Sequence, residues 1–181
     1  MSGSILITGG TASGKSRFAV SYFSGCNNVL YLKSGLTADW DIINRIQYDT
    51  EKHDVSWDVI PTASLTPSTI VGEHKYVIFD NLRTFTKLIM DEMAPDCEID
   101  ELMRKSIERR VISEITALRE RVNENLGTIV IITVESGFSF SEESSGMSAF
   151  RDILGRVNQR IANTSDEVYF SASGIQFKIK E

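Results

Sequence analysis

Apolar residues fall along the chain in short runs that are separated by longer stretches of mixed polarity. Four runs are apolar at consecutive positions and rich in β-branched residues, namely 4–8 (SILIT), 29–32 (VLYL), 76–80 (YVIFD) and 128–134 (TIVIITV). Such runs are typical of strands that are buried on both faces of a parallel sheet. Weaker strand patterns lie at 56–60, 168–170 and 175–179, and the last two flank a turn at 171–174, which predicts a C-terminal β-hairpin.

Between these runs, apolar positions recur at steps of three to five residues, which is typical of helices with one buried face. The longest such stretch has its apolar face at Leu102, Ile107, Val111, Ile115, Leu118 and Val122. The predicted helices are 15–23, 38–48, 81–93, 99–126 and 149–163, and the polar segments 62–68 and 135–146 are predicted loops. Strands that alternate with helices predict an α/β fold with a mainly parallel sheet flanked by helices.

Composition narrows the class of protein. A chain of 181 residues with 41% apolar and 24% charged residues is typical of one globular domain, here 1–181. The net charge of −6 argues against binding nucleic acid by bulk charge. Two cysteines, Cys26 and Cys97, predict reduced thiols rather than a disulfide framework. We find neither a signal peptide nor an apolar run near the roughly 20 residues of a membrane span, so a cytoplasmic protein is expected.

One motif carries a specific chemistry. The predicted strand 4–8 and helix 15–23 are joined by a G-x-x-x-x-G-K-S sequence, made of Gly9, Gly10, Thr11, Ala12, Ser13, Gly14, Lys15 and Ser16. The glycines let backbone N–H groups curl around phosphate oxygens, and the helix N-terminus adds its positive end. Lys15 is expected to reach the β- and γ-phosphates, while the Ser16 hydroxyl binds Mg²⁺. The motif therefore predicts a P-loop fold that binds ATP or GTP together with Mg²⁺.

Two carboxylates follow strand ends, where ligands bind on a parallel sheet. Asp80 closes the run 76–80, the position from which P-loop proteins hold Mg²⁺ directly or through water. Alternatively, Asp80 is the N-cap of the helix that follows. Glu135 comes after the run 128–134 and is a candidate for orienting a hydroxyl or a water molecule.

Three stretches together resemble the bacterial cobinamide kinase / cobinamide-phosphate guanylyltransferase family of cobalamin nucleotide-loop assembly. They are ILITGGTASGKSRFA at 5–19, RIQYDTEKHDVSW at 45–57 and FRDILGRVNQRIANTSDEVYFSASGIQFKIK at 150–180. The last stretch is the most specific, since a generic P-loop kinase has no reason to carry it. The resemblance spans essentially the whole chain and is weakest at 61–75 and 90–124.

The resemblance implies two activities in one site. The first phosphorylates the aminopropanol hydroxyl of adenosylcobinamide with a nucleoside triphosphate, and the second transfers GMP from GTP through a guanylylated histidine. It further implies a homo-oligomer, often a trimer. It also implies nucleotide contacts at Lys33, Ser34 and Gly35, for which an ordinary β–α turn is the alternative.

The sequence departs from the family at the residue that accepts the nucleotide. The family places this histidine within R-I-x-x-H, where the present chain has Asp49. Neutral imidazole is a good nucleophile near pH 7, and a carboxylate does not replace it easily. His53 lies four residues further on and is a candidate displaced nucleophile; otherwise both residues are ordinary polar positions. The substitution puts the guanylyltransferase reaction in doubt and leaves the kinase reaction standing.

Other departures leave three functions open. Arg83, Val134 and the loop 138–143 differ from the family pattern, and Phe138 and Phe140 are candidate lid or subunit contacts. The first function is a cobinamide kinase. The second is a paralogue that phosphorylates another small alcohol, and the third is a nucleotide-binding regulator with little catalysis. Asn158, in the G-x-V-N-Q motif, is expected to fix helix-to-loop packing rather than catalyse.

Overall fold

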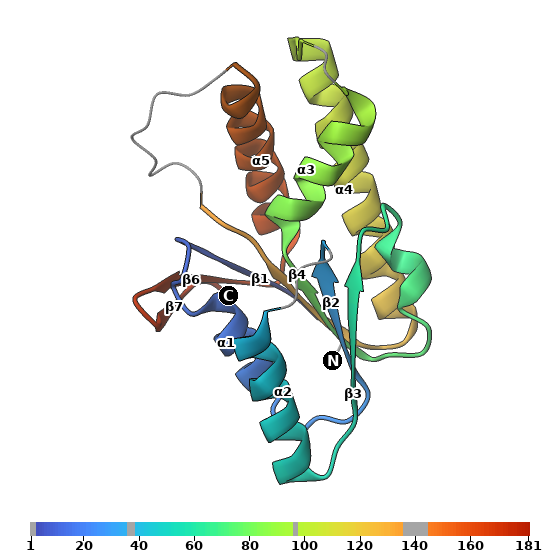
Figure 1. Ribbon diagram of the computed structural model, residues 1–181, viewed down its shortest axis with the longest axis vertical. Coiled ribbons are helices and arrows are strands. Elements are labelled where there is room, and N and C mark those ends of the chain that lie inside the picture. The colour runs from blue at the N-terminus through green and yellow to red at the C-terminus, as the bar shows by residue number, and fades with distance from the viewer. Residues whose placement is uncertain (1–2, 36–38, 96–97, 136–144) are drawn as a thin grey trace.

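The structure, a computed structural model, describes residues 3–35, 39–95, 98–135 and 145–181. Its strands form a seven-stranded sheet in the order β3-β2-β4-β5-β1-β6-β7 (Figure 1). All neighbouring strands are parallel except β6 and β7, which form an antiparallel hairpin. The strands are β1 (Gly3–Gly9), β2 (Val29–Ser34), β3 (Trp57–Thr62), β4 (Tyr76–Asp80), β5 (Thr128–Ile132), β6 (Glu167–Ala172) and β7 (Ile175–Lys180).

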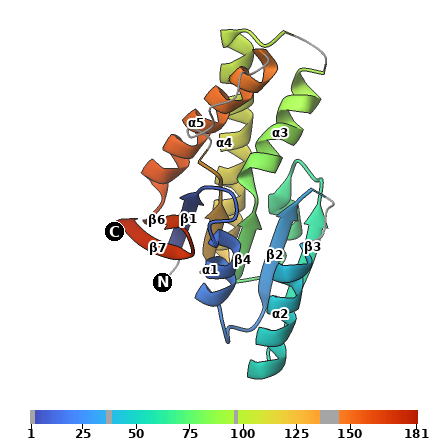
Figure 2. The ribbon, with the colours of Figure 1, turned by 60° about the vertical axis from the view of Figure 1, so that its left-hand side comes forward.

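Helices cover both faces of the sheet, as Figures 1 and 2 show. The helices are α1 (Lys15–Tyr22), α2 (Trp40–His53), α3 (Leu82–Met93), α4 (Glu101–Glu124) and α5 (Ser145–Thr164), with a 3₁₀ turn, η1 (Pro67–Ile70). On one face α1 and α2 pack against side chains such as Ile7, Tyr31 and Ile132. On the other face α3, α4 and α5 pack against alternate side chains such as Leu6 and Phe79. Strands that are apolar on both faces are thus buried by two helical layers.

The expected fold class is confirmed, and the differences lie at element ends. Helix α2 continues to His53, beyond the predicted end at Tyr48, and stops where Asp54 adopts a left-handed conformation with φ 53°. Strand β5 ends at Ile132 rather than at 134, and helix α5 begins earlier than predicted, at Ser145. Strand β3 accommodates Pro61 because it lies at the edge of the sheet.

Strand order determines which loops meet at one edge. Strand β5 lies between β1 and β4, and the registers pair Ile132 with both Ile7 and Asp80. The carboxyl ends of these three parallel strands therefore reach the same edge of the sheet, where the P-loop follows β1, Asp80 ends β4 and Glu135 comes shortly after β5. Among the described residues, no helix is long and apolar enough to cross a membrane.

The turn between α4 and β5 leads to a prediction about stability. A Cβ atom on Gly127 would lie 2.0 Å from the backbone oxygen of Lys75, whereas Gly155 on α5 has nothing within 4 Å of that position. We expect Gly127→Ala to lower the free energy of unfolding by about 1–3 kcal/mol, because the backbone has to shift. Gly155→Ala is the matched control and should be neutral or stabilising by up to about 1 kcal/mol. Urea unfolding of both variants checks this, and equal effects would contradict it.

Candidate active site

The P-loop holds its lysine inside the curl of its own backbone. Gly14 caps α1 with φ 94°, a left-handed conformation that favours glycine. The buried Lys15 ammonium donates to the backbone oxygen of Gly9 (3.1 Å), to that of Gly10 and to the Ser13 hydroxyl (3.3 Å). Burial lowers the pKa of Lys15, and the negative charge of Asp80 opposes this shift. The ammonium is thus held by the backbone of the loop, within reach of the Asp80 charge.

Asp80 gathers three polar side chains around one buried carboxylate. It is only 4% exposed, and its Oδ2 accepts hydrogen bonds from the Ser16 hydroxyl (3.1 Å) and from the Tyr31 hydroxyl. The Lys33 ammonium lies 3.9 Å from the same oxygen. Burial, together with the Asp80 charge, raises the pKa of Tyr31, so its phenol stays a neutral donor. Asp80 is not the N-cap of α3, because the Asn81 side chain accepts from the Thr84 N–H instead.

The Ser16 and Asp80 oxygens form a pair that fits Mg²⁺. Hydroxyl and carboxylate oxygens are ligands that this ion prefers, and it usually keeps waters and substrate phosphates in its coordination sphere. The described residues contain no group of three His, Cys, Asp or Glu side chains able to hold a metal ion by themselves. Ser16 and Asp80 therefore suit a cation that arrives together with a nucleotide.

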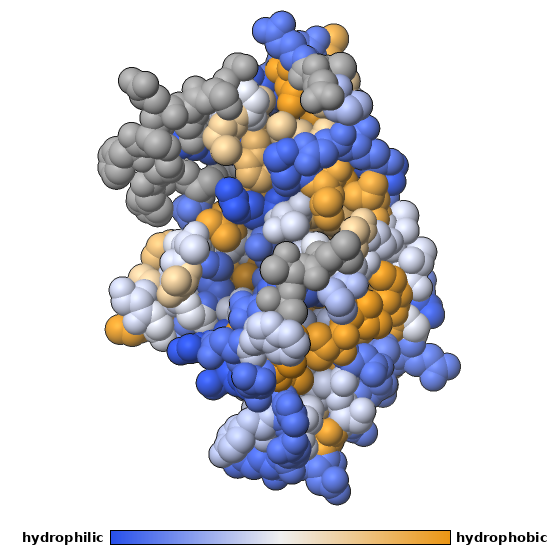
Figure 3. Space-filling model, viewed as in Figure 1, coloured by the Kyte–Doolittle hydropathy of each residue, from blue (hydrophilic) through white to orange (hydrophobic). Residues whose placement is uncertain are grey.

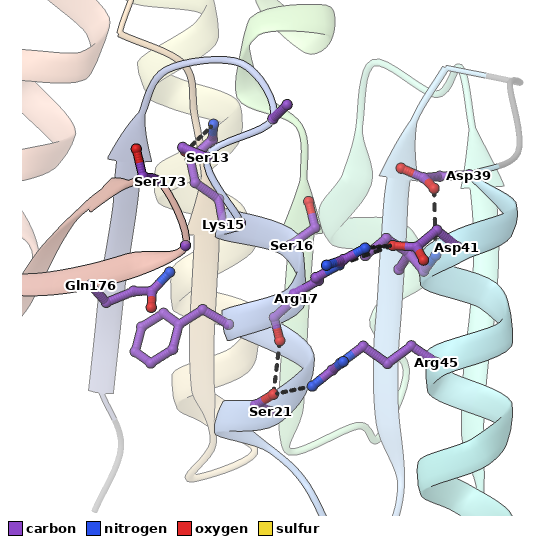
Figure 4. A pocket seen from close by; sticks show the side chains of 15 residues that line it. Ser13, Lys15, Ser16, Arg17, Ser21, Asp39, Asp41, Arg45, Ser173 and Gln176 are labelled. Carbon is purple, nitrogen blue, oxygen red and sulfur yellow. Dashed lines mark hydrogen bonds and ion pairs between the residues drawn. The ribbon is translucent and has the colours of Figure 1, made fainter.

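A cavity of about 740 Å³ opens beside the P-loop. We call it the P-loop cavity; α1, the start of α2 and the tip of the β6–β7 hairpin line it (Figure 4). Arg17 on α1 pairs with Asp41 on α2 at 2.9 Å, and Arg45 donates to the Ser21 hydroxyl at 3.1 Å. Hydrophilic residues gather over α1 and α2 on this face, next to apolar surface over β3 (Figure 3). The volume and the polar lining suit a phosphorylated nucleoside.

The C-terminal hairpin supports the P-loop from the side. The backbone oxygen of Ser13 accepts from the Ser171 hydroxyl (2.6 Å) and from the Gly174 N–H (3.0 Å), and Gln176 donates to the same hydroxyl (2.9 Å). A Cβ atom on Gly9 would lie 2.2 Å from the backbone oxygen of Ser171. The glycine of the motif thus permits close contact with the hairpin, as well as with a phosphate.

Hydrogen bonds from α5 fix the segment after β5. The Thr133 hydroxyl donates to the Asn158 Oδ1 at 2.7 Å, and the Asn158 amide donates to the backbone oxygen of Val134 at 3.1 Å. The Glu135 N–H donates to the backbone oxygen of Gly9 at 3.1 Å, which anchors Glu135 beside the P-loop. These contacts agree with the packing role predicted for Asn158 and place Glu135 between the P-loop and Asp80 along the sheet edge.

Lys33, Ser34 and Gly35 border a second cavity rather than the P-loop cavity. It has a volume of about 410 Å³ and is lined by Lys33, Ser34, Gly35, Asp39, Trp40, Asn81 and Thr84. Gly35 has φ 90° and donates its N–H to the backbone oxygen of Thr62 at 2.7 Å, directly after the end of β2. Lys33 and Ser34 are thus the last residues of the strand, and the nucleotide contacts predicted for 33–35 stay a prediction.

Asp49 and His53 lie away from the two cavities. Asp49 accepts from the Ser24 hydroxyl (2.5 Å) and from the Gly25 N–H (3.2 Å), in the turn that follows α1. The His53 Nε2 is 3.8 Å from Asp49. Arg45 on α2 lines the P-loop cavity, and Asp49 lies one turn, about 6 Å, further along the helix. Neither Asp49 nor His53 lines either cavity.

The remaining positions that the sequence analysis named are Arg83, Cys97 and the loop 138–143. The Arg83 guanidinium lies 5.7 Å from the centre of the Phe150 ring, which is a packing contact between α3 and α5. Cys97, Phe138 and Phe140 lie outside the described residues, as do the other positions of the loop 138–143.

Three residues of the site carry no local signal of their role. Tyr31 belongs to an apolar run, and only its alternation with Lys33 along β2 shows that the two share a face. Ser171 and Gln176 belong to the hairpin pattern. The contact of Ser171 with Ser13 joins residues 158 positions apart, which no local pattern indicates.

Comparison with known proteins gives consistent matches. A model of the family described as cobinamide kinase / cobinamide phosphate guanyltransferase matches residues 5–179. The bifunctional adenosylcobalamin biosynthesis protein CobU of Escherichia coli (strain K12) is 29% identical over 179 residues, covering 97% of this chain and 99% of the relative. The protein of the same name from Salmonella typhimurium (strain LT2) is 30% identical over 185 residues, with the same coverage.

The hairpin contact predicts a loss of nucleotide affinity in Ser171→Ala. The change removes one of two donors to the Ser13 oxygen, and the loss of about 1 kcal/mol for such a bond corresponds to roughly five-fold weaker ATP or GTP binding. Calorimetric titration below the unfolding transition measures it. Ser113→Ala, at an exposed position of α4, is the control and should bind as the wild type does. Equal affinities of both variants would show that the hairpin does not tune the loop.

Proposed function

The chain belongs to the cobinamide kinase / cobinamide phosphate guanyltransferase family, and on this premise we propose that it phosphorylates the aminopropanol hydroxyl of adenosylcobinamide with ATP or GTP. The observation that carries the proposal is the cluster of Lys15, Ser16 and Asp80. Its Ser16–Asp80 hydrogen bond is 3.1 Å long, and the ammonium of Lys15 lies within the P-loop beside it. A lysine for the phosphates, with a hydroxyl and a carboxylate for a metal ion, is the set of groups that phosphoryl transfer requires.

Each residue of the cluster has a role in binding the donor. Backbone N–H groups of 9–16 surround the phosphates, and Lys15 exchanges its contacts with the loop oxygens for the β- and γ-phosphates. Ser16 and Asp80 hold Mg²⁺, which neutralises phosphate charge when bound. The Tyr31 hydroxyl and the Lys33 ammonium keep the Asp80 carboxylate in position.

The transfer itself requires alignment more than covalent help. The acceptor oxygen attacks the γ-phosphorus, a new O–P bond forms, and the bond to the β–γ bridging oxygen breaks. The nucleoside diphosphate leaves with that electron pair, and Glu135 takes the proton of the acceptor hydroxyl. Anchoring of the Glu135 backbone to Gly9 at 3.1 Å supports this assignment.

The proposal includes loss of the guanylyl-transfer step that uses a histidine. Asp49 stands at the position of the family nucleophile, and its carboxylate is already bonded to Ser24 and Gly25. Forming an acyl phosphate on Asp49 would require the attacking oxygen to give up its hydrogen bond to Ser24 or to Gly25. His53 remains the alternative nucleophile, but its side chain lines neither cavity, which argues against this role.

Other expectations stay predictions of the sequence and the resemblance. They are one kinase domain over 1–181, a homo-oligomer, a cytoplasmic location and no nucleic-acid partner. The alternatives of another small alcohol as substrate, or of a regulator, stand if cobinamide proves inert.

Isotope transfer tests the proposed reaction. With Mg²⁺ and cobinamide, we expect label from γ-labelled ATP or GTP to appear on cobinamide and no label from α-labelled GTP to stay on the protein. Lys15→Ala should abolish the first signal, because the β- and γ-phosphates lose their cation. A family member that carries the histidine serves as the positive control for α-label. Covalent α-label on this protein would overturn the loss of the second step, and Asp49→Asn and His53→Ala would then identify the residue.

The role of Glu135 can be tested separately. Replacing a general base typically costs 10²–10⁴-fold in rate, so we expect Glu135→Gln to lower kcat about 100-fold or more and to leave nucleotide affinity unchanged. Steady-state kinetics and nucleotide titration measure the two quantities. Glu120→Gln, at an exposed position of α4, is the control. Unchanged turnover in Glu135→Gln would exclude Glu135 as the base.

A further inference from the structure

Lys33 places a positive charge beside the carboxylate that is expected to bind Mg²⁺. Its Nζ lies 3.9 Å from the Asp80 Oδ2, and its side chain is only 21% exposed, so the ion pair is largely shielded from water. The Lys15 ammonium also feels the Asp80 charge, but the backbone oxygens of Gly9 and Gly10 hold it in the P-loop. A buried carboxylate is costly without a compensating cation. Lys33 is the cation that the fold supplies to Asp80.

The groups that contact Asp80 converge on one of its two oxygens. The Ser16 hydroxyl (3.1 Å), the Tyr31 hydroxyl and the Lys33 ammonium all lie against Oδ2. A Mg²⁺ ion at Ser16 and Asp80 is held by carboxylate oxygen directly or through water. It therefore brings two positive charges to a carboxylate that already has an ammonium beside it.

Mg²⁺ and the Lys33 ammonium thus compete for the same carboxylate. Like charges repel each other, and the repulsion is stronger where protein shields it from water. Strand β2 ends at Ser34, and the Lys33 side chain lines the second cavity, of about 410 Å³, as well as contacting Asp80. Because a lysine has a flexible four-carbon stem, its ammonium can turn into that space. The cavity gives the ammonium a second position away from the metal ion.

We infer that Lys33 holds Asp80 before the metal ion arrives and is displaced when it binds, so that the site takes Mg²⁺ well only together with a nucleotide. Free Mg²⁺ removes the partner of the ammonium and offers nothing in return. The phosphates of a nucleotide give the displaced ammonium new negative charge to contact. The nucleotide contacts that the resemblance implies at 33–35 agree with this second position. The inference rests on the proposed Mg²⁺ role of Ser16 and Asp80.

Lys33→Met tests the competition, because it removes the charge and keeps much of the side-chain length. In EDTA we expect it to lower the melting temperature by about 5 °C or more, since the buried carboxylate loses its cation. MgCl2 without nucleotide should reverse the loss, at a midpoint concentration about tenfold lower than in the wild type. Scanning calorimetry measures both, with the ionic strength kept constant by NaCl. If the variant folds only with metal, circular dichroism against MgCl2 concentration gives the same midpoint.

Three further variants assign the effect to the ion pair. Lys33→Arg keeps the charge and should behave as the wild type does. Lys87→Met removes an ammonium from an exposed pair with Asp91 on α3, and should change neither the stability in EDTA nor the response to MgCl2. Asp80→Asn added to Lys33→Met should abolish the response to MgCl2, because the amide offers no charge to the ion.

The outcomes separate the inference from the proposed metal site. If Mg²⁺ strengthens ATP binding in titrations of the wild type, but Lys33→Met and the wild type respond alike to MgCl2 alone, the inference is overturned and the metal site stands. If the response of Lys33→Met survives Asp80→Asn, the ion binds elsewhere, which also overturns the inference. If Mg²⁺ leaves ATP affinity of the wild type unchanged, the proposed metal role is wrong and the inference fails with it.

Discussion

The buried carboxylate of Asp80 brings together the polar side chains at the carboxyl edge of the sheet. Burying a charge is costly unless other groups compensate it, and Asp80 is compensated by two hydroxyl donors and one ammonium group. The Ser16 hydroxyl comes from α1, and the Tyr31 hydroxyl and the Lys33 ammonium come from β2. The buried charge is therefore compensated only when α1 and β2 both lie in place beside β4. Lys33 also lines the second cavity, so the groups that stabilise Asp80 in the fold belong to the candidate site as well.

The sequence predicted the sheet and the P-loop because their signals are local. The runs at 4–8 and 76–80 are apolar on both faces, and the glycines of the motif follow the first run directly. The position of Asp80 at a strand end was enough to suggest a metal ligand, and the structure places it next to Ser16 as that suggestion requires. Excluding Asp80 as the helix cap needed the structure, since Asn81 is just as good a cap, and the metal role stays a prediction.

Contacts between segments that are far apart in the sequence could not be predicted from local patterns. Nothing near Ser171 indicates that its hydroxyl reaches Ser13, and nothing near Tyr31 marks it as more than a core residue. For Asp49 the motif comparison showed the loss of an imidazole, and only the structure showed that the carboxylate ties α2 to the turn after α1. Its neighbours explain why an aspartate is stable there, which the chemistry of nucleotidyl transfer alone would not.

The position of β1 in the sheet has a consequence for the nascent chain. This strand precedes both of its neighbours in the chain, β5 and β6, which begin at Thr128 and Glu167. The apolar run at 4–8 has to wait without a partner until β5 has been translated, and its second edge stays open until β6 follows. Pairings over such separations form slowly and leave apolar edges open to other chains. Chaperone binding during synthesis should therefore matter most for the very strand that carries the phosphate loop.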